Sequence, residues 1–170
     1  MTEQQQQDQE EFDEAEADMR SEVFFESMAK DYPELMEKSI INYFGVQSGW
    51  YTIIALLCHG LYAPISQAQR NLSSAKFLGN TDKIDKLTQA LADAIEDLPV
   101  ISDVKEKFGT MRFHVYAGTP EAHALIDFAE GLSAHTCEKC GDRGETDTNG
   151  WIKTHCKKHF RKTFNPQDAK

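Results

Sequence analysis

The sequence has no apolar run that reaches the roughly 18 residues a membrane-spanning helix needs. Its first residues also lack the basic and apolar stretches of a secretory signal peptide. Cysteine is scarce: there are four in 170 residues, three of them fall in one short motif, and Cys58 stands alone. A lone thiol beside such a motif argues against a disulfide framework and predicts a reducing compartment, the cytoplasm.

Basic residues are also scarce, with 18 Lys and Arg against 28 Asp and Glu, a formal net charge of -10 and a pI near 5.0. This balance lies well below the basic footprint of most DNA-binding domains. The charge is uneven, because residues 1–40 hold 13 acidic and 3 basic side chains whereas residues 41–170 hold 15 of each. From Cys137 onward, the sequence holds 8 basic and 5 acidic side chains. The sequence therefore predicts an acidic front, a neutral body and a mildly basic tail.

Two ligand pairs near the end of the chain carry the strongest signal. Cys137 and Cys140 form a C-x-x-C pair, and fifteen residues later Cys156 and His159 form a C-x-x-H pair. Zinc takes four thiolate or imidazole ligands in a tetrahedron, and a short C-x-x-C loop presents two of them in one turn. Gly141 after the second cysteine allows the backbone to turn beneath the metal. We predict one structural Zn²⁺ held by these four side chains.

The residues between the pairs predict a hairpin, with arms over 143–146 and 151–154 joined by a turn that contains Asn149-Gly150. Cys156 and His159 are then expected on the first turn of a terminal helix that stops near Pro166, which completes a zinc ribbon or treble clef. His155 is a competing fourth ligand, but as the direct neighbour of Cys156 it would strain the site. Four protein ligands leave no position for water or substrate, which favours a structural over a catalytic metal.

We expect three parts in the chain. Residues 1–20, rich in Gln and acid, are predicted to be a disordered arm. It is either a solvated tail, the reading we favour, or an acidic surface that docks on a basic partner. Residues 135–170 form the zinc ribbon, and residues 21–134 form a helical body with one hairpin, so that the fold class is α+β.

Helical periodicity organises most of the body. After an apolar patch that ends at Asp31, the pattern predicts a helix from Pro33 to a stop at Gly45. The stretch from Trp50 to Leu61 is apolar almost all round, so it is expected to be the buried core helix, which Pro64 ends or kinks. Thr81 is expected to cap the next helix, which closes at Pro99.

The period then changes to that of strands. Residues 100–106 and 110–116 are expected to pair as a hairpin around Lys107-Phe108-Gly109. Thr119-Pro120 is expected to start the last helix of the body. Basic residues of this hairpin and of the ribbon are a candidate nucleic-acid surface, with Phe108 and Tyr116 available for stacking. The plainer interpretation, which we favour, is a solvated face with ion pairs to Asp103 and Glu106. The candidate basic residues are Lys105, Lys107, Arg112, Lys153, Lys157, Lys158, Arg161 and Lys162.

No catalytic group stands out. Cys58-His59 is the nearest approach to a nucleophile and base, but neighbours on a helix point about 100° apart and cannot form the required hydrogen bond. A buried structural cysteine is the favoured interpretation. His114, His123 and His135 are isolated along the chain, so we expect no enzymatic activity.

Several motifs carry a resemblance to known proteins. They are Val104-Lys105-Glu106-Lys107-Phe108-Gly109 with Met111-Arg112-Phe113, Thr136-Cys137-Glu138 with Cys140-Gly141, and Gly150-Trp151 ahead of Cys156. Over residues 48–160 the chain resembles a family of small phage and prophage proteins with a VKEKFG-x-LRF strand and a TCE-x-CG knuckle. The resemblance implies a phage origin, a bacterial host cytoplasm and a zinc knuckle, but no particular activity.

These features together predict a non-catalytic phage accessory protein that binds a host protein, for instance a defence or nucleic-acid-handling complex. The acidic front, the closed metal site and the missing catalytic group support this hypothesis, since an acidic surface competes for sites built for phosphate. The alternative is a nucleic-acid-binding module in phage replication or transcription that uses the basic hairpin and ribbon.

Overall fold

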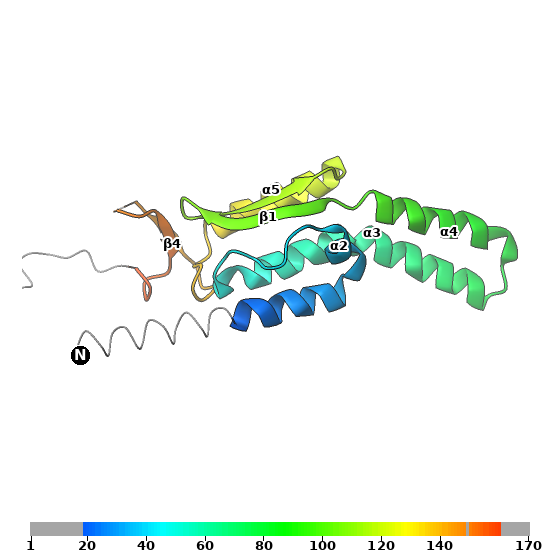
Figure 1. The fold of residues 1–170 in the computed structure, drawn as a ribbon, viewed down its shortest axis with the longest axis horizontal. Helices are drawn as coiled ribbons and strands as arrows, with labels where there is room; N and C mark the ends of the chain where they lie inside the picture. Colours follow the sequence, from blue (N-terminus) through cyan, green and yellow to red (C-terminus); the bar gives the residue numbers. More distant parts are fainter. Residues whose placement is uncertain (1–18, 149, 161–170) are drawn as a thin grey trace, which may run out of the picture.

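The computed structural model describes residues 19–148 and 150–160, and the predicted α+β class is confirmed (Figure 1). Residues 19–31 form the first helix, which is followed by short segments and then by a long helical hairpin, a strand hairpin and the ribbon. The elements are α2 (Pro33–Lys38), η1 (Ser48–Trp50), α3 (Tyr51–Phe77), α4 (Thr81–Glu96), β1 (Val100–Lys107), β2 (Thr110–Tyr116), α5 (Pro120–Ser133), β3 (Glu145–Asp147) and β4 (Lys153–His155).

The first half of α3 is the centre of the core, as predicted. Trp50, Ile54 and Cys58 have no exposed surface, and the hairpin β1–β2 and α5 pack against them through their own apolar faces. Leu56 departs from the prediction of a helix buried all round, because 65% of its surface is exposed. The face of α3 that carries Leu56 is therefore not covered by the core among the described residues.

The second half of α3 and the whole of α4 form an arm that projects from the body (Figure 1). A turn at Gly79, where φ is +64°, reverses the chain between the two helices. The arm is held by an apolar seam in which Leu72 of α3 is buried, whereas α4 has no buried residue among its 16. Pro64 lies inside α3 and does not end it, since the helix continues to Phe77.

The strand hairpin and α5 complete the body. β1 pairs antiparallel with β2 around a two-residue turn, and Met111 and Phe113 of β2 are buried toward the core. Thr119 caps α5 as predicted, with its hydroxyl oxygen accepting a hydrogen bond from the backbone N–H of Ala122 at 3.2 Å. α5 leads within three residues into the first metal-motif cysteine, which ties the ribbon to the body.

The helix predicted from Pro33 to Gly45 is wrong beyond its first turns, because α2 ends at Lys38. Ser39 is extended, and the following chain bonds the edge of β1 instead. The N–H of Ile40 donates to the Ile101 carbonyl at 3.0 Å, and that of Gly45 to the Val104 carbonyl at 2.8 Å. The free edge of β1 outcompetes the local helical pattern, since it satisfies backbone groups that a helix would otherwise satisfy.

Two smaller expectations also change. The helix N-cap predicted at Thr81 lies one residue earlier, at Asn80, and makes no side-chain capping bond. The predicted disordered arm, residues 1–20, lies outside the described residues except for Met19 and Arg20, which are helical. Among the helices in the described ranges, none combines the length and apolarity needed to cross a bilayer.

Candidate metal centre

The first ligand pair sits in a tight turn that packs on the body. The Gly141 N–H donates to the Cys137 carbonyl at 2.9 Å, and Gly141 has φ of +78°, a conformation that suits glycine. A Cβ on Gly49 of η1 would lie only 2.2 Å from the Cys137 carbonyl oxygen. The Gly49 N–H donates to the Glu138 carbonyl at 2.9 Å. The knuckle therefore seats directly on the start of the core helix.

The second ligand pair follows β4, which pairs antiparallel with β3 as the predicted hairpin. Cys156 and His159 lie in a turn in which the N–H groups of His159 and Phe160 both donate to the Cys156 carbonyl at 2.9 Å. The terminal helix expected here is absent from residues 156–160, and its predicted continuation lies outside the described residues. The turn alone brings both side chains to the knuckle.

The four predicted ligands converge on one point, with donor atoms all within 4.8 Å of one another. The Cys137 and Cys156 Sγ atoms each lie 3.4 Å from His159 Nδ1, and the Cys140 and Cys156 Sγ atoms are 3.6 Å apart. A tetrahedron with metal–ligand bonds of 2.0–2.3 Å has edges of about 3.3–3.8 Å, so a metal ion fits between them. Three thiols and one imidazole form a donor set suited to zinc.

Charge and hydrogen bonding differ among the thiols. At Cys156, burial raises the pKa, but the backbone N–H groups of Lys158 and His159 and the neighbouring thiols more than offset this and lower the pKa to about 7. At Cys140, a hydrogen bond from the Asp142 backbone lowers the pKa, but burial and the thiols of Cys137 and Cys156 more than offset it, so that the pKa rises to about 11. Because a metal binds thiolates, metal binding releases protons, and the affinity of the site for the metal rises with pH.

His155 lies outside this group. Its ring points to Glu138, with Nε2 3.6 Å from Glu138 Oε1, beyond hydrogen-bond range. Burial lowers the pKa of His155 despite the nearby carboxylate, so the neutral ring is favoured. The geometry therefore favours His159 over His155 as the fourth ligand.

A buried ion-pair network joins the ribbon to the hairpin β1–β2. Glu138 is 1% exposed, and its Oε1 lies 3.3 Å from Lys153 Nζ, which also bonds Glu106 Oε2 at 2.8 Å. Burial lowers the pKa of Lys153, but Glu106 and Glu138 more than offset this, so the net shift is upward. Sequence reasoning missed Glu138, since a glutamate inside a knuckle is normally exposed and nothing local marks it.

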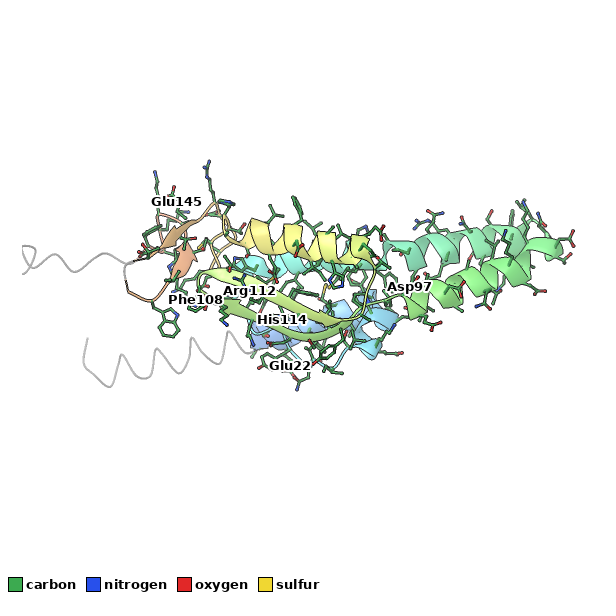
Figure 2. The ribbon with its side chains drawn as sticks, turned by 90° about the horizontal axis from the view of Figure 1, so that it is seen from above. Glu22, Asp97, Phe108, Arg112, His114 and Glu145 are labelled. Atoms are coloured by element: carbon green, nitrogen blue, oxygen red, sulfur yellow. The ribbon has the colours of Figure 1, made fainter. Side chains whose placement is uncertain are left out.

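The tip of the same hairpin is wedged against the ribbon. A Cβ on Gly109 would lie 3.2 Å from atoms of Thr146, Lys153 and Thr154, so a side chain there would require these ribbon residues to shift. The Gly109 N–H donates to Glu106 Oε1 at 2.7 Å. This contact leaves Phe108 outside, beside the ribbon (Figure 2).

Phe108 is unusual in two respects. Its φ is +53°, in the left-handed region that β-carbon-bearing residues avoid at a cost of roughly 1–2 kcal/mol. Its side chain is nevertheless 65% exposed, so the fold gains little burial in return. Lys107 Nζ lies 5.6 Å from the ring centroid. Trp151, in the β3–β4 connection of the ribbon, is 69% exposed. Two large aromatic side chains are thus displayed at this end of the molecule.

Four of the six candidate nucleic-acid residues that the structure describes have acidic partners, Lys153 among them. Lys105 pairs with Asp103, Arg112 Nη1 lies 3.8 Å from Glu130 Oε2, and Lys158 Nζ lies 3.8 Å from Asp142 Oδ2. Lys107 covers Phe108, and Lys157 is exposed. Arg161 and Lys162 lie outside the described residues. The ion pairs agree with the solvated-face interpretation, although the partners are only in part those expected.

The fourth cysteine, Cys58, does not belong to the ligand group found among the described residues. Cys58 is fully buried in the core, and burial raises the pKa of its thiol to about 12, which keeps it protonated and unreactive. Among the described residues, the four ligands above form the one His, Cys, Asp and Glu cluster with metal-site geometry. Comparison with protein-family models, curated proteins and solved structures found no match to this chain, so the phage-family resemblance stays a prediction.

Proposed function

We propose that this protein is a non-catalytic, zinc-binding interaction module of the bacterial cytoplasm, and that its ribbon end binds a partner protein. Three thiolates and an imidazole in a tetrahedral arrangement suit zinc, and four protein ligands leave no open position for chemistry. Its role is to fix the ribbon against the hairpin tip. Following the sequence resemblance, the partner is a protein of the host cell.

Phe108 is the observation that carries the proposal. The two-residue turn between β1 and β2 has positive φ at both Phe108 and Gly109, a conformation in which Asn, Asp or Gly is usual. Phenylalanine is a costly residue at such a position, and backbone strain of this kind clusters at functional sites. An exposed phenylalanine in such a conformation, on the same end as the exposed Trp151, has the composition of a binding hot spot. The acid-paired lysines and arginine beside it favour a protein over a nucleic-acid backbone.

The test exploits the strain. Asparagine tolerates the left-handed region, so Phe108→Asn is expected to stabilise the fold by about 1 kcal/mol while it removes the aromatic ring. Ala117→Asn is the matched control, because Ala117 has φ of +57° at the far end of β2. Affinity capture from host lysate is expected to recover a protein with wild type and Ala117→Asn, and to lose it with Phe108→Asn and Trp151→Ser.

Two results would contradict the proposal. The first is equal recovery by wild type and Phe108→Asn, which would make the ring irrelevant to binding. The second is tight binding to short DNA or RNA with a steep salt dependence, which would assign this end to nucleic acid instead.

A further inference from the structure

A second surface runs along one side of α5, from its ribbon-proximal end toward the base of the arm. Leu125, Phe128 and Leu132 are 39%, 66% and 39% exposed. Their spacing of three and four residues places them on one face of the helix. The adjacent face, about 100° around the helix, supplies the buried residues Ala122, Ile126 and Ala129. α5 is thus apolar on two faces, and only one of them belongs to the core.

α3 extends this surface. A Cβ on Gly60 would lie 3.2 Å from Leu125 Cδ1, and near the start of α3 the Trp50 indole donates to the Thr136 carbonyl at 2.8 Å. The two helices therefore run antiparallel. Leu56, one turn before Gly60, faces the side of α5 that carries Phe128 and Leu132. We call Leu56, Gly60, Leu125, Phe128 and Leu132 the α3–α5 strip.

The strip opens into a groove of about 360 Å³ where α4 meets α3 and α5. The floor of the groove is apolar, formed mainly by Leu61, Pro64, Ala94, Leu98, Ala122 and Leu125. Three exposed carboxylates, those of Asp93, Asp97 and Glu121, stand on its rim, and none of the described residues that line it is basic. Figure 2 shows Asp97 at the base of the arm, far from Phe108.

Charge limits what the groove can accept. An acidic rim over an apolar floor suits a lysine or arginine, whose aliphatic stem can lie on the floor while its cation meets the carboxylates. Nearby, Lys38 Nζ donates to the Ile95 carbonyl at 3.2 Å, at the C-terminal end of α4, where the helix dipole also favours a cation. Phosphate-bearing partners and anionic membranes are disfavoured by the same charges.

The spacing of the apolar residues in the strip indicates the shape of the partner. Anchors at i, i+3 and i+7 span about 10 Å along a helix, which matches the apolar face of an amphipathic partner helix laid in a groove. We propose that the α3–α5 strip and its groove bind an amphipathic helix of a protein partner, with a lysine or arginine of that helix against Asp93, Asp97 and Glu121. This surface goes beyond the proposed function of the ribbon end.

Three synthetic helical peptides of about 18 residues test the proposal with the full-length protein. The first carries leucines at i, i+3 and i+7 followed by lysines, the second replaces the lysines by glutamates, and the third replaces the leucines by glutamines. At low salt, the lysine peptide is expected to bind at least about tenfold more tightly than either of the others. Asp97→Asn with Glu121→Gln is expected to remove the preference for lysine over glutamate.

A pair of phenylalanine variants locates the binding. Phe128→Ser is expected to weaken the lysine peptide at least about tenfold. Phe77→Ser removes a phenylalanine that is 90% exposed at the arm tip, and it should leave binding unchanged. Phe108→Asn should also bind as wild type does, which separates this surface from the ribbon end.

Three outcomes would overturn the proposal. One is no binding of the lysine peptide by the wild-type protein. Another is equal loss with Phe77→Ser, which would show general stickiness. The third is a dimer in sedimentation equilibrium that Phe128→Ser dissociates, since the strip would then be covered by a second copy of the chain.

Discussion

The two ends of this molecule are stabilised in different ways. At the ribbon end, two three-residue strands enclose almost no apolar core, and the structure relies on converging metal ligands, buried ion pairs and a wedged glycine. At the arm end, α3 and α4 share an apolar seam without any metal group. A short ribbon thus depends on a few specific contacts, whereas the arm depends mainly on the apolar surface shared by its two helices.

Removal of zinc with a chelator should produce the largest difference in stability between the ribbon end and the arm end. Structural zinc contributes on the order of 10–16 kcal/mol in small modules, so its removal is expected to unfold the ribbon and leave the arm helical. A thiol reagent at pH 8 should then modify three cysteines rapidly, while Cys58, with its pKa raised to about 12 by burial, reacts only after denaturation. Three slow thiols after chelation would contradict this expectation.

Loss of the buried ion pair between Lys153 and Glu138 should have the next largest effect on the free energy of unfolding. Lys153→Met leaves the buried carboxylate of Glu138 without its cation, which costs close to the lower end of about 3–5 kcal/mol because Lys153 is 24% exposed. Lys105→Met is the matched control, since its pair with Asp103 is at the surface and should cost under about 1 kcal/mol. Urea unfolding of both variants measures the difference, and equal losses would show that the network does not hold the ribbon.

The arm should respond to lost packing instead. Leu72→Ala removes a side chain that is 8% exposed and is expected to cost about 2–5 kcal/mol, felt as faster hydrogen exchange in α3 and α4. Leu78→Ala at the tip, where the side chain is 72% exposed, should change stability by no more than about 0.5 kcal/mol. Loss of metal from Leu72→Ala would contradict the independence of the two ends.

Local patterns were enough to predict much of this molecule. The ligand quartet, the core helix at Ile54 and the Thr119 cap all follow from spacing or residue type, because each depends on neighbours in the chain. The partners of Ile40 and Glu138 could not be predicted, since each is decided by a distant segment, the edge of β1 and Lys153 respectively. The strain at Phe108 was hidden for another reason: sequence gives the turn, but not which of its residues takes a positive φ.

Native mass spectrometry of protein purified without added zinc shows whether the four side chains hold a metal ion. We expect one Zn²⁺ per chain for the wild type, retained in Leu72→Ala and lost in Cys140→Ser. Less than about half an equivalent of zinc in the wild type, or full occupancy in Cys140→Ser, would contradict a Cys3His site that organises the ribbon end.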